Sequence, residues 1–192
     1  MHIMTRRVAG VAMLMLATST VAALEFKQVQ TNESAITFGY TQMGVPLDGR
    51  FGKFKAQLSF DPSRPDKAQA RLEIDLASID TGSSEANDEV AGKLWFNTKA
   101  YPSATFVSGG VKALGGNHYQ VSGKLGIKGK MLDVSTPVTF KADGTRGTFE
   151  GAFAIKRLDY GIGEGEWTDV STVANEILIK FHVVVNASPG NK

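Results

Sequence analysis

Apolar and polar residues alternate with a period of two through most of this 192-residue chain. In AITFGYT the apolar residues are Ile36, Phe38 and Tyr40, and in EILIKFHVVV every second residue from Ile177 to Val185 is apolar. Successive side chains of a β-strand point to opposite faces of a sheet, so this pattern is typical of strands with one buried face. About eight segments carry the pattern, which predicts an all-β fold.

Short turn signals separate these segments. Glycine and asparagine tolerate the positive φ angles that tight turns require. Such residues occur at Asp48-Gly49, Gly109-Gly110, Gly115-Gly116-Asn117 and Asp143-Gly144. Strands joined this closely are antiparallel, because a parallel pair needs a longer crossover. The segment SSEANDEVAGKLWF departs from the alternation, and Ser83 or Ser84 could cap a short helix there.

An antiparallel meander of this length has exposed edges unless it closes on itself or pairs with a second sheet. We expect a single extended antiparallel β-barrel of about eight strands with one short helical insertion. The inward positions are rich in Phe and Tyr and almost free of charge. These rings either fill a solid core or line an apolar cavity, and the periodicity is compatible with both.

The first 23 residues have the features of a cleavable export signal. The basic pair Arg6–Arg7 precedes an apolar run from Val8 to Leu16, and the small residue Ala23 stands at the expected cleavage site. A retained membrane anchor is the weaker alternative, because the run is well short of the ~20 residues that span a bilayer. We therefore predict a periplasmic protein with a cleaved signal peptide at 1–23 and one domain at 24–192.

The composition excludes several classes of function. The chain has 21 Lys and Arg and 19 Asp and Glu, and the predicted signal peptide holds two Arg and no acid, so 21 − 2 leaves 19 charges of each sign. A neutral surface does not favour nucleic-acid binding, which needs a clustered basic surface. Because the chain has no cysteine, disulfides, thiolate catalysis and thiolate-bound metals are also excluded.

Few residues are candidates for catalysis. His118 and His182 are the histidines that remain after cleavage, and neither lies in a Ser-His-Asp or His-x-x-x-His context. Both are expected to be surface residues. We predict no catalytic residue, no metal site and no cofactor.

Four stretches resemble a known family in their order and spacing. They are FGKFKAQLSFDPSRPDKAQARLEIDLASIDTG, WFNTKAYPSATFVSGG, YQVSGKLGIKG and RLDYGIG. The sequence from Phe26 to Val185 is similar to the YceI-like family of exported lipid-binding proteins. This resemblance implies a lipocalin-like barrel that holds a polyisoprenoid or isoprenoid-quinone lipid in an elongated apolar interior.

The matching positions are mostly aromatic, and one segment differs from the family. The motif R-x-D-F-G corresponds to residues 157–161, with Tyr160 in place of Phe. On the predicted helix, residues 86–90 read ANDEV where many members have an Arg-Asp-x-His-Leu run, so no role of that Arg or His can be transferred. The other matching positions are Phe51, Phe54, Trp95, Phe96, Tyr101, Pro102 and Phe106.

The stretch DYGIGEGEW at 159–167 has three interpretations. A nucleotide-binding loop needs a helix after it, and the two glutamates would repel phosphate. The carboxylates of Glu164, Glu166 and Asp169 could present oxygens to Ca²⁺, but the sequence places no second acidic cluster to complete the ligand set. We favour the third interpretation, a glycine-rich loop that connects strands at the mouth of the barrel.

Side chains in and before this loop receive specific roles. Tyr160, Ile162 and Trp167 are predicted to dip inward as an apolar rim. Arg157 and Asp159 are two residues apart at a strand end and share one face, so they could form an ion pair. The alternative is that they orient a lipid head group, because arginine is well suited to anionic groups.

The predicted lipid contacts combine the inward strand positions with the aromatic segments. Packing of a long isoprenoid chain against apolar side chains is the interaction that the resemblance implies. The predicted contacts are Phe38, Tyr40, Phe51, Phe54, Leu58, Phe60, Leu72, Ile74, Trp95, Phe96, Phe106, Phe149, Phe153, Tyr160, Ile162 and Trp167.

The predicted function is that of a non-catalytic periplasmic carrier for a polyisoprenoid or isoprenoid-quinone lipid. The alternative is a ligand-free interaction or redox-accessory module with a filled barrel. The GEGEWTD segment and Trp95 resemble a subgroup of the family found near membrane cytochrome b561 proteins, which makes such a cytochrome the candidate partner. The sequence leaves the oligomeric state open, a homodimer included.

Overall fold

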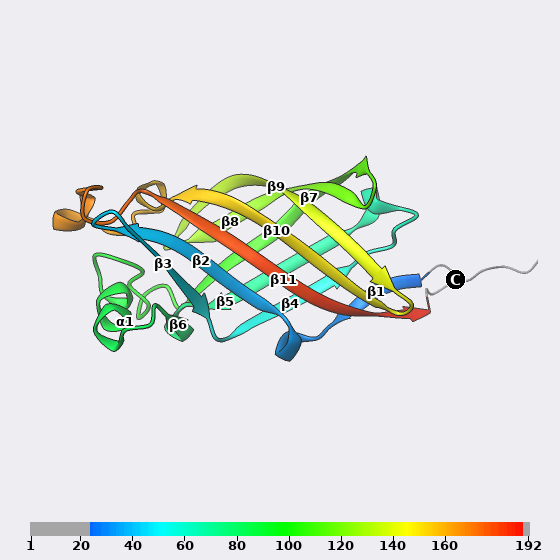
Figure 1. Cartoon of the computed structure of the whole chain (residues 1–192), viewed down its shortest axis with the longest axis horizontal. Helices are drawn as coiled ribbons and strands as arrows, with labels where there is room; N and C mark the ends of the chain where they lie inside the picture. The colour runs from blue at the N-terminus through cyan, green and yellow to red at the C-terminus, as the bar shows by residue number, and fades with distance from the viewer. Residues whose placement is uncertain (1–23, 190–192) are drawn as a thin grey trace, which may run out of the picture.

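Strand β11 (Glu176–Pro189) organises the sheet, because it pairs with three other strands. One edge pairs with β10 (Arg146–Lys156). The other edge pairs first with β2 (Ala35–Gln42) and then with β1 (Leu24–Val29), in both cases antiparallel. The long alternating run near the C-terminus therefore lies inside the sheet and joins the N-terminal strands β1 and β2 to β10 (Figure 1).

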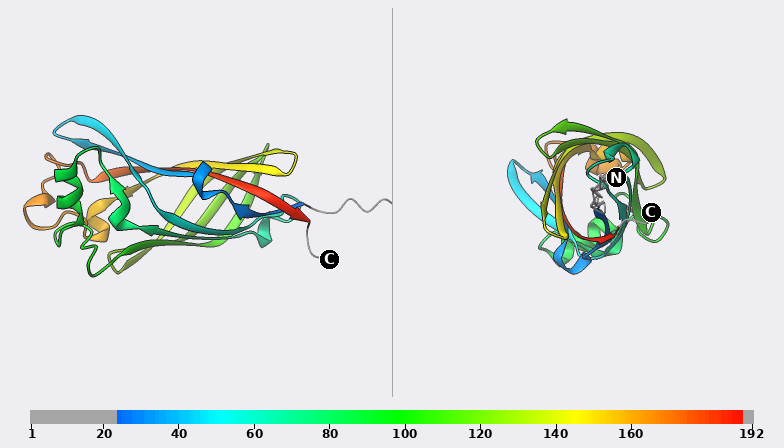
Figure 2. Two further views of the ribbon diagram at one scale, coloured as in Figure 1. Left: turned by 90° about the horizontal axis from the view of Figure 1, so that it is seen from below. Right: turned by 90° about the vertical axis from the view of Figure 1, so that its right-hand side faces the viewer.

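This computed structural model describes residues 24–189, which form one antiparallel sheet curled into an elongated barrel (Figures 1 and 2). The backbone groups of Phe26 in β1 and Phe60 after β4 bond to each other at 2.8 and 3.0 Å and close the barrel at one end. The predicted all-β antiparallel barrel is confirmed, with 11 strands in the sheet. Ten of them follow the order β4 (Phe54–Ser59), β5 (Gln69–Asp75), β7 (Ser103–Gly115), β8 (His118–Ile127), β9 (Lys130–Asp143), β10, β11, β2, β3 (Val45–Phe51) and β6 (Ile79–Asp80), and β1 pairs with β11 outside this order.

Of the four glycine-containing turns predicted from the sequence, two are turns and two lie inside strands. The turns predicted at 115–117 and 143–144 are confirmed. Residues 48–49, predicted as a turn, lie inside β3, and the chain reverses at 43–44, where φ is 50° and 81°. Residues 109–110 lie inside β7, next to a shift in its register with β8. Glycine at these two incorrectly predicted turns marks a close approach or a bulge within a strand.

The predicted helical insertion is confirmed as α1 (Ser84–Ala91). The Ser83 side chain accepts a hydrogen bond from the backbone N–H of Ala86 at 3.4 Å and caps the helix. Helix α1 lies with η4 and η5 at one end of the barrel, which we call the helical end (Figures 1 and 2). The short 3₁₀ helices are η1 (Thr31–Glu33), η2 (Pro65–Lys67), η3 (Leu76–Ser78), η4 (Arg157–Tyr160) and η5 (Gly165–Thr168).

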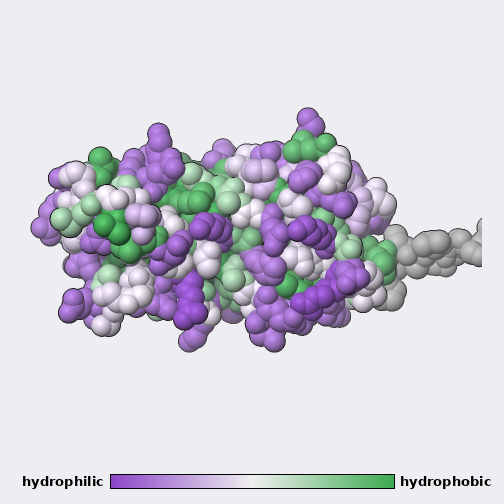
Figure 3. Space-filling view, in the orientation of Figure 1, coloured by the Kyte–Doolittle hydropathy of each residue, from purple (hydrophilic) through white to green (hydrophobic). Residues whose placement is uncertain are grey.

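Two clusters of buried apolar side chains occupy the interior. The cluster at the helical end includes Leu76, Trp95 and Tyr160. The cluster at the opposite end, which we call the aromatic plug, is built from rings packed largely edge to face, with Phe60 within 5.2 Å of three of them. The rings of the aromatic plug are Phe26, Phe60, Tyr119, Phe140 and Phe149. The face of the barrel in Figure 3 is largely hydrophilic, with apolar residues scattered among the polar ones.

The ends of the chain lie outside the described part. The predicted export signal at 1–23 falls there, as do residues 190–192. From residue 24 to 189 the chain forms a single continuous sheet with its connections. None of the helices in this part is long and apolar enough to cross a lipid bilayer.

Candidate functional site

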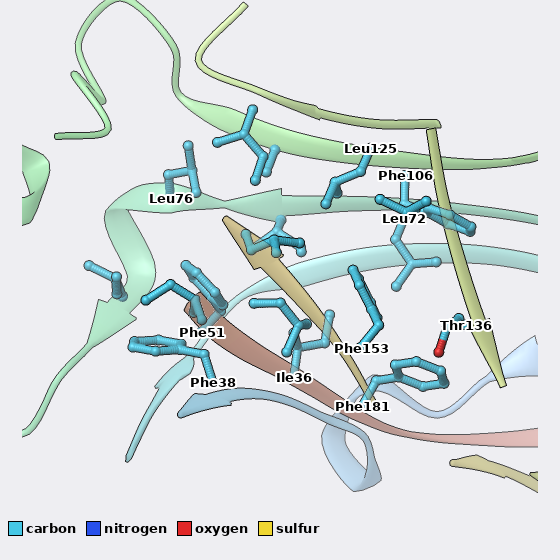
Figure 4. Close-up of a pocket in the computed structure, with 18 of the residues that line it drawn as sticks. Ile36, Phe38, Phe51, Leu72, Leu76, Phe106, Leu125, Thr136, Phe153 and Phe181 are labelled. Atoms are coloured by element: carbon cyan, nitrogen blue, oxygen red, sulfur yellow. The ribbon is translucent and has the colours of Figure 1, made fainter. Parts of the chain in front are cut away.

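A cavity of about 560 Å³ runs along the barrel interior, from the helical end toward the aromatic plug (Figure 4). Its walls come from the inward faces of the strands, from α1 and from the segment 157–173. The buried polar residues in this lining are Thr136 and Arg157. A volume of this size is typical of a small-ligand site. The inward rings therefore line a cavity along the barrel, and at the aromatic plug they also pack against one another.

Phenylalanine rings in the cavity wall lie against glycines of neighbouring strands. Phe38 in β2 is paired with Gly49 in β3, and Phe181 in β11 is paired with Gly151 in β10. A Cβ atom at either glycine would collide with the paired ring. Both rings appear among the lining residues of the close-up (Figure 4). The absence of a side chain opposite each ring lets the ring lie close to the wall and leaves the interior open.

Adding a methyl group at Gly151 tests this arrangement. In Gly151→Ala the new Cβ would lie 2.8 Å from the carbonyl oxygen of Pro137 as well as against Phe181. Because a backbone oxygen moves less freely than a side chain, we expect the free energy of unfolding to fall by about 1–3 kcal/mol. Urea denaturation followed by circular dichroism measures this change. The control is Ala152→Thr on the outer face of the same strand, and an equal loss in both variants would contradict the explanation.

Arg157 is 1% exposed and donates all of its side-chain N–H groups to backbone carbonyls. Its guanidinium group lies 5.3 Å from the centroid of the Trp95 ring. Burial lowers the pKa of Arg157 from its usual value. Since no donor is left over for a ligand, the side chain holds the segment around it in place. The acceptors are Ala174 at 3.1 Å, Ile162 at 2.9 Å, Gly163 at 3.2 Å, Trp167 at 2.6 Å and Val173 at 2.7 Å.

Asp159 is exposed and does not pair with Arg157. The predicted ion pair assumed a strand, in which residues two apart share a face. The structure has the 3₁₀ helix η4 at this position, and residues two apart then point in different directions. The ion pair was therefore predicted incorrectly, because the strand was assumed to include Arg157 and Asp159, whereas β10 ends at Lys156.

Two segments, 92–97 and 157–173, form one unit over the helical end, which we call the cap. The Lys128 ammonium group donates to the Glu164 carboxylate at 3.0 Å and to one backbone carbonyl of each segment, at 3.1 and 2.6 Å. The backbone N–H of Glu164 donates to the carbonyl of Leu94 at 2.8 Å. These bonds link the segment after α1 to the loop after β10.

The stretch DYGIGEGEW lies in the cap. Ile162 and Trp167 line the cavity, and Tyr160 is buried behind it. Asp169 accepts hydrogen bonds from the backbone N–H and hydroxyl of Ser171, which lower the pKa of its carboxyl. Within residues 24–189 no group of three or more histidine or acidic side chains is placed to hold a metal ion.

The structure brings most of the predicted lipid contacts together. All of them line the cavity except Phe54 and Tyr160, which pack against the buried cluster at the helical end. Burial, with a contribution from the neighbouring Asp159 carboxylate, raises the pKa of Tyr160 to about 12. Of the two residues considered for head-group orientation, Arg157 lines the cavity and Asp159 does not.

The prediction missed part of the wall. Many missed residues are aliphatic and continue the same alternation, so the signal was present, but the prediction favoured aromatic rings. The contribution of α1 had no sequence signal, because its residues are mostly polar. The missed residues include Ile36, Leu76, Ile79, Ala104, Leu125, Ile127, Val134, Thr136, Ile155, Val173, Ile177, Ile179, Phe181 and Val183 of the strands and loops, and Glu85, Ala86, Glu89 and Val90 of α1.

The cavity reaches solvent beside α1. Glu85 and Glu89 line the cavity and are also exposed to solvent, so the cavity opens at the surface next to them. Gln57 and Gln69 are likewise exposed lining residues, on the side of β4 and β5. The opening at the helical end therefore carries negative charge, while the cavity walls are apolar.

An antiparallel barrel around an apolar cavity is the architecture of lipocalin-like proteins. The sequence pattern of the YceI-like domain matches residues 28–185, and the chain belongs to this family. The resemblance drawn from the sequence motifs is thereby confirmed. The matched region contains the strands that surround the cavity and both segments of the cap.

Similar proteins share this fold at different levels of identity. The UPF0312 protein plu2095 of Photorhabdus laumondii is 31% identical over 160 residues, which cover 78% of this chain and 81% of that protein. The crystal structure of Burkholderia cenocepacia BcnA is 48% identical, with a TM-score of 0.80, and the match covers 82% of this chain and 99% of that chain. A polyisoprenoid binding domain from Saccharophagus degradans is 19% identical with a TM-score of 0.65, over 86% of this chain and 99% of that chain. The barrel is retained even where most residues differ.

Proposed function

We propose that this protein is a non-catalytic carrier that holds a polyisoprenoid or isoprenoid-quinone lipid in the barrel cavity. The observation that carries the proposal is the apolar cavity of about 560 Å³ along the barrel axis. The similar Saccharophagus degradans domain, which is described as polyisoprenoid binding, supports a chain-like lipid as the ligand. The predicted export signal supports the periplasm as the place of action.

The energetics of burial favour a ligand of this kind. Transfer of one five-carbon isoprene unit from water to an apolar site contributes about 4 kcal/mol, at ~0.8 kcal/mol per carbon. Part of this gain is offset by ordering of the flexible chain. Because a few units already supply a large affinity, the tail alone can hold the lipid, and strong head-group contacts are not required.

The alternative of an interaction module with a filled barrel has less support. Such a module needs a solid interior, whereas the side chains of Phe38 and Phe181 lie against glycines and leave the interior open. A carrier needs this open space. A cytochrome partner remains the candidate for the alternative function.

Native mass spectrometry of the exported protein tests the carrier function. We expect a complex whose added mass, after extraction into organic solvent, is identified as a prenyl lipid at close to one per chain. Addition of squalene to delipidated protein should restore a one-to-one complex. A bare protein mass that takes up neither squalene nor an isoprenoid quinone would contradict the proposal.

A further inference from the structure

A strip of apolar side chains continues the cavity wall beyond the barrel. Tyr40 and Gln42 of β2 line the cavity at the helical end. Leu47 and Val45 of β3 lie directly opposite them in the sheet, so they share the same face. They are 38% and 55% exposed, and Met43 at the turn between the two strands is 77% exposed. We call Met43, Val45 and Leu47 the apolar strip; it lies on a hairpin that projects from the barrel at the helical end (Figure 2).

Met43 occupies a backbone position that does not favour methionine. Its φ is 50° and that of Gly44 is 81°, so both central residues of the turn are left-handed. Two-residue hairpin turns of this kind strongly prefer Asn-Gly. A large apolar side chain here gives up a favourable turn residue and gains no contact with a core. Burial of the side chain against another surface accounts for its presence.

The charges around the apolar strip are balanced. No charged residue occurs from 42 to 47. The next two charged residues of β3 are both paired, Asp48 with Lys180 at 3.2 Å and Arg50 with Asp80 at 3.0 Å. The apolar strip therefore offers apolar contact with no net charge behind it. Such a surface suits a bilayer of zwitterionic lipids, where binding depends on the apolar area that is buried.

Other occupants fit the apolar strip less well. A stable protein interface uses about 20–30 residues on each side, far more than this strip offers. A further strand could add at the edge of β3, since within residues 24–189 β6 pairs only with Arg50 and Phe51 of this strand. Pro46 has no N–H and Asp48 is charged, and both features disfavour such pairing. A lipid bilayer requires neither a large contact area nor backbone partners.

We propose that the apolar strip inserts into the surface of a lipid bilayer and holds the mouth of the cavity against it. Because the strip continues the cavity wall, a lipid chain can pass from the bilayer into the barrel along apolar side chains. The contact is reversible, because a few side chains bury much less apolar area than a membrane-spanning helix. Glu85 and Glu89 at the opening repel anionic head groups, so zwitterionic lipids are preferred. The transfer of a lipid rests on the proposed carrier function, whereas the docking itself does not.

Vesicle binding tests the docking with substitutions that preserve the hairpin. Met43→Asn supplies the residue that this turn prefers, so the variant should be at least as stable as the wild type. We expect Met43→Asn and Val45→Ser each to lower the partition coefficient on phosphatidylcholine vesicles roughly ten-fold, from the burial of one apolar side chain. Cosedimentation of the delipidated mature protein with sucrose-loaded vesicles measures this coefficient.

The opposite end of the barrel supplies a matched control. Leu114 is 55% exposed, as Val45 is, and it follows Ala113, which pairs with Tyr119 of the aromatic plug. Leu114→Ser removes an equally exposed apolar side chain far from the apolar strip, so we expect it to bind vesicles like the wild type. Phosphatidylglycerol in the vesicles should weaken binding of the wild type, because it is anionic.

Lipid uptake from two sources separates the docking from the carrier function. Squalene is supplied either in phosphatidylcholine vesicles or as a cyclodextrin complex. We expect Met43→Asn to take up squalene from vesicles roughly ten-fold more slowly than the wild type, in line with its weaker docking. From cyclodextrin both proteins should take it up at the same rate, since Met43 does not line the cavity.

Each outcome supports or overturns a separate statement. Vesicle binding that is unchanged in Met43→Asn and Val45→Ser would overturn the docking, while uptake from cyclodextrin would leave the carrier function standing. Tighter binding to vesicles with phosphatidylglycerol would overturn the preference for zwitterionic lipids. A dimer in analytical ultracentrifugation that Met43→Asn abolishes, without any vesicle binding, would make a second copy the occupant. If the wild type binds vesicles but takes up squalene from neither source, the carrier function fails and the docking stands.

Discussion

We expect Arg157→Ala to lower the free energy of unfolding by at least about 3 kcal/mol. The guanidinium group is buried and satisfies five backbone carbonyls of the chain around the cap. Its removal leaves these carbonyls in a dry interior without donors, and each unpaired group adds a penalty. Urea denaturation followed by tryptophan fluorescence reports the loss, because Trp95 and Trp167 both belong to the cap.

Two further variants separate a positioning role from a general effect of charge. Arg157→Lys keeps the positive charge but has three donors instead of five, so its stability should fall between those of the wild type and Arg157→Ala. Arg71→Ala removes an exposed arginine of β5 and should change stability by less than about 0.5 kcal/mol. Wild-type stability of Arg157→Ala together with reduced lipid binding would contradict the positioning role and favour contact with a head group.

The strands and their inward faces were predictable because a half-buried strand imposes a period of two on the sequence. This signal identified every strand that alternates clearly, including β2, β5 and β11. It missed the short strands β1, β3 and β6. Strand β3 was missed because Asp48-Gly49 has turn chemistry, although in the sheet Gly49 leaves room for the Phe38 ring. That reason depends on the partner strand, and cross-strand register is not visible in a single segment.

The sequence predicted which types of side chain line the site. It did not predict the shape or volume of the cavity between them. Alternation shows which side chains face inward, but the volume they leave depends on which residue lies opposite each ring, as with Phe181 over Gly151. The role of Arg157 was misjudged for a similar reason. Its partners include the backbone carbonyls of Ile162, Trp167 and Val173. Every residue type has a backbone carbonyl, so the sequence does not mark these acceptors.

The capacity of the cavity should depend on the small side chains in its wall. Ala56 of β4 lines the cavity, and Ala56→Trp places an indole in a space of about 560 Å³. Each isoprene unit that is excluded costs about 4 kcal/mol of burial at ~0.8 kcal/mol per carbon. Even if ordering of the chain offsets half of this, the loss of one unit weakens squalene binding by about 30-fold. Titration of delipidated protein with squalene measures the change.

The neighbouring residue supplies a matched control for this substitution. Lys55 is exposed on the outer face of β4 and does not line the cavity, so Lys55→Trp adds the same side chain outside the barrel. We expect Lys55→Trp to bind squalene like the wild type, and both variants should keep the circular dichroism spectrum of the barrel. Unchanged squalene affinity in Ala56→Trp would mean that the lipid does not use this wall. A loss confined to Ala56→Trp would locate the isoprenoid chain inside the barrel, because the two variants differ only in the face that carries the indole.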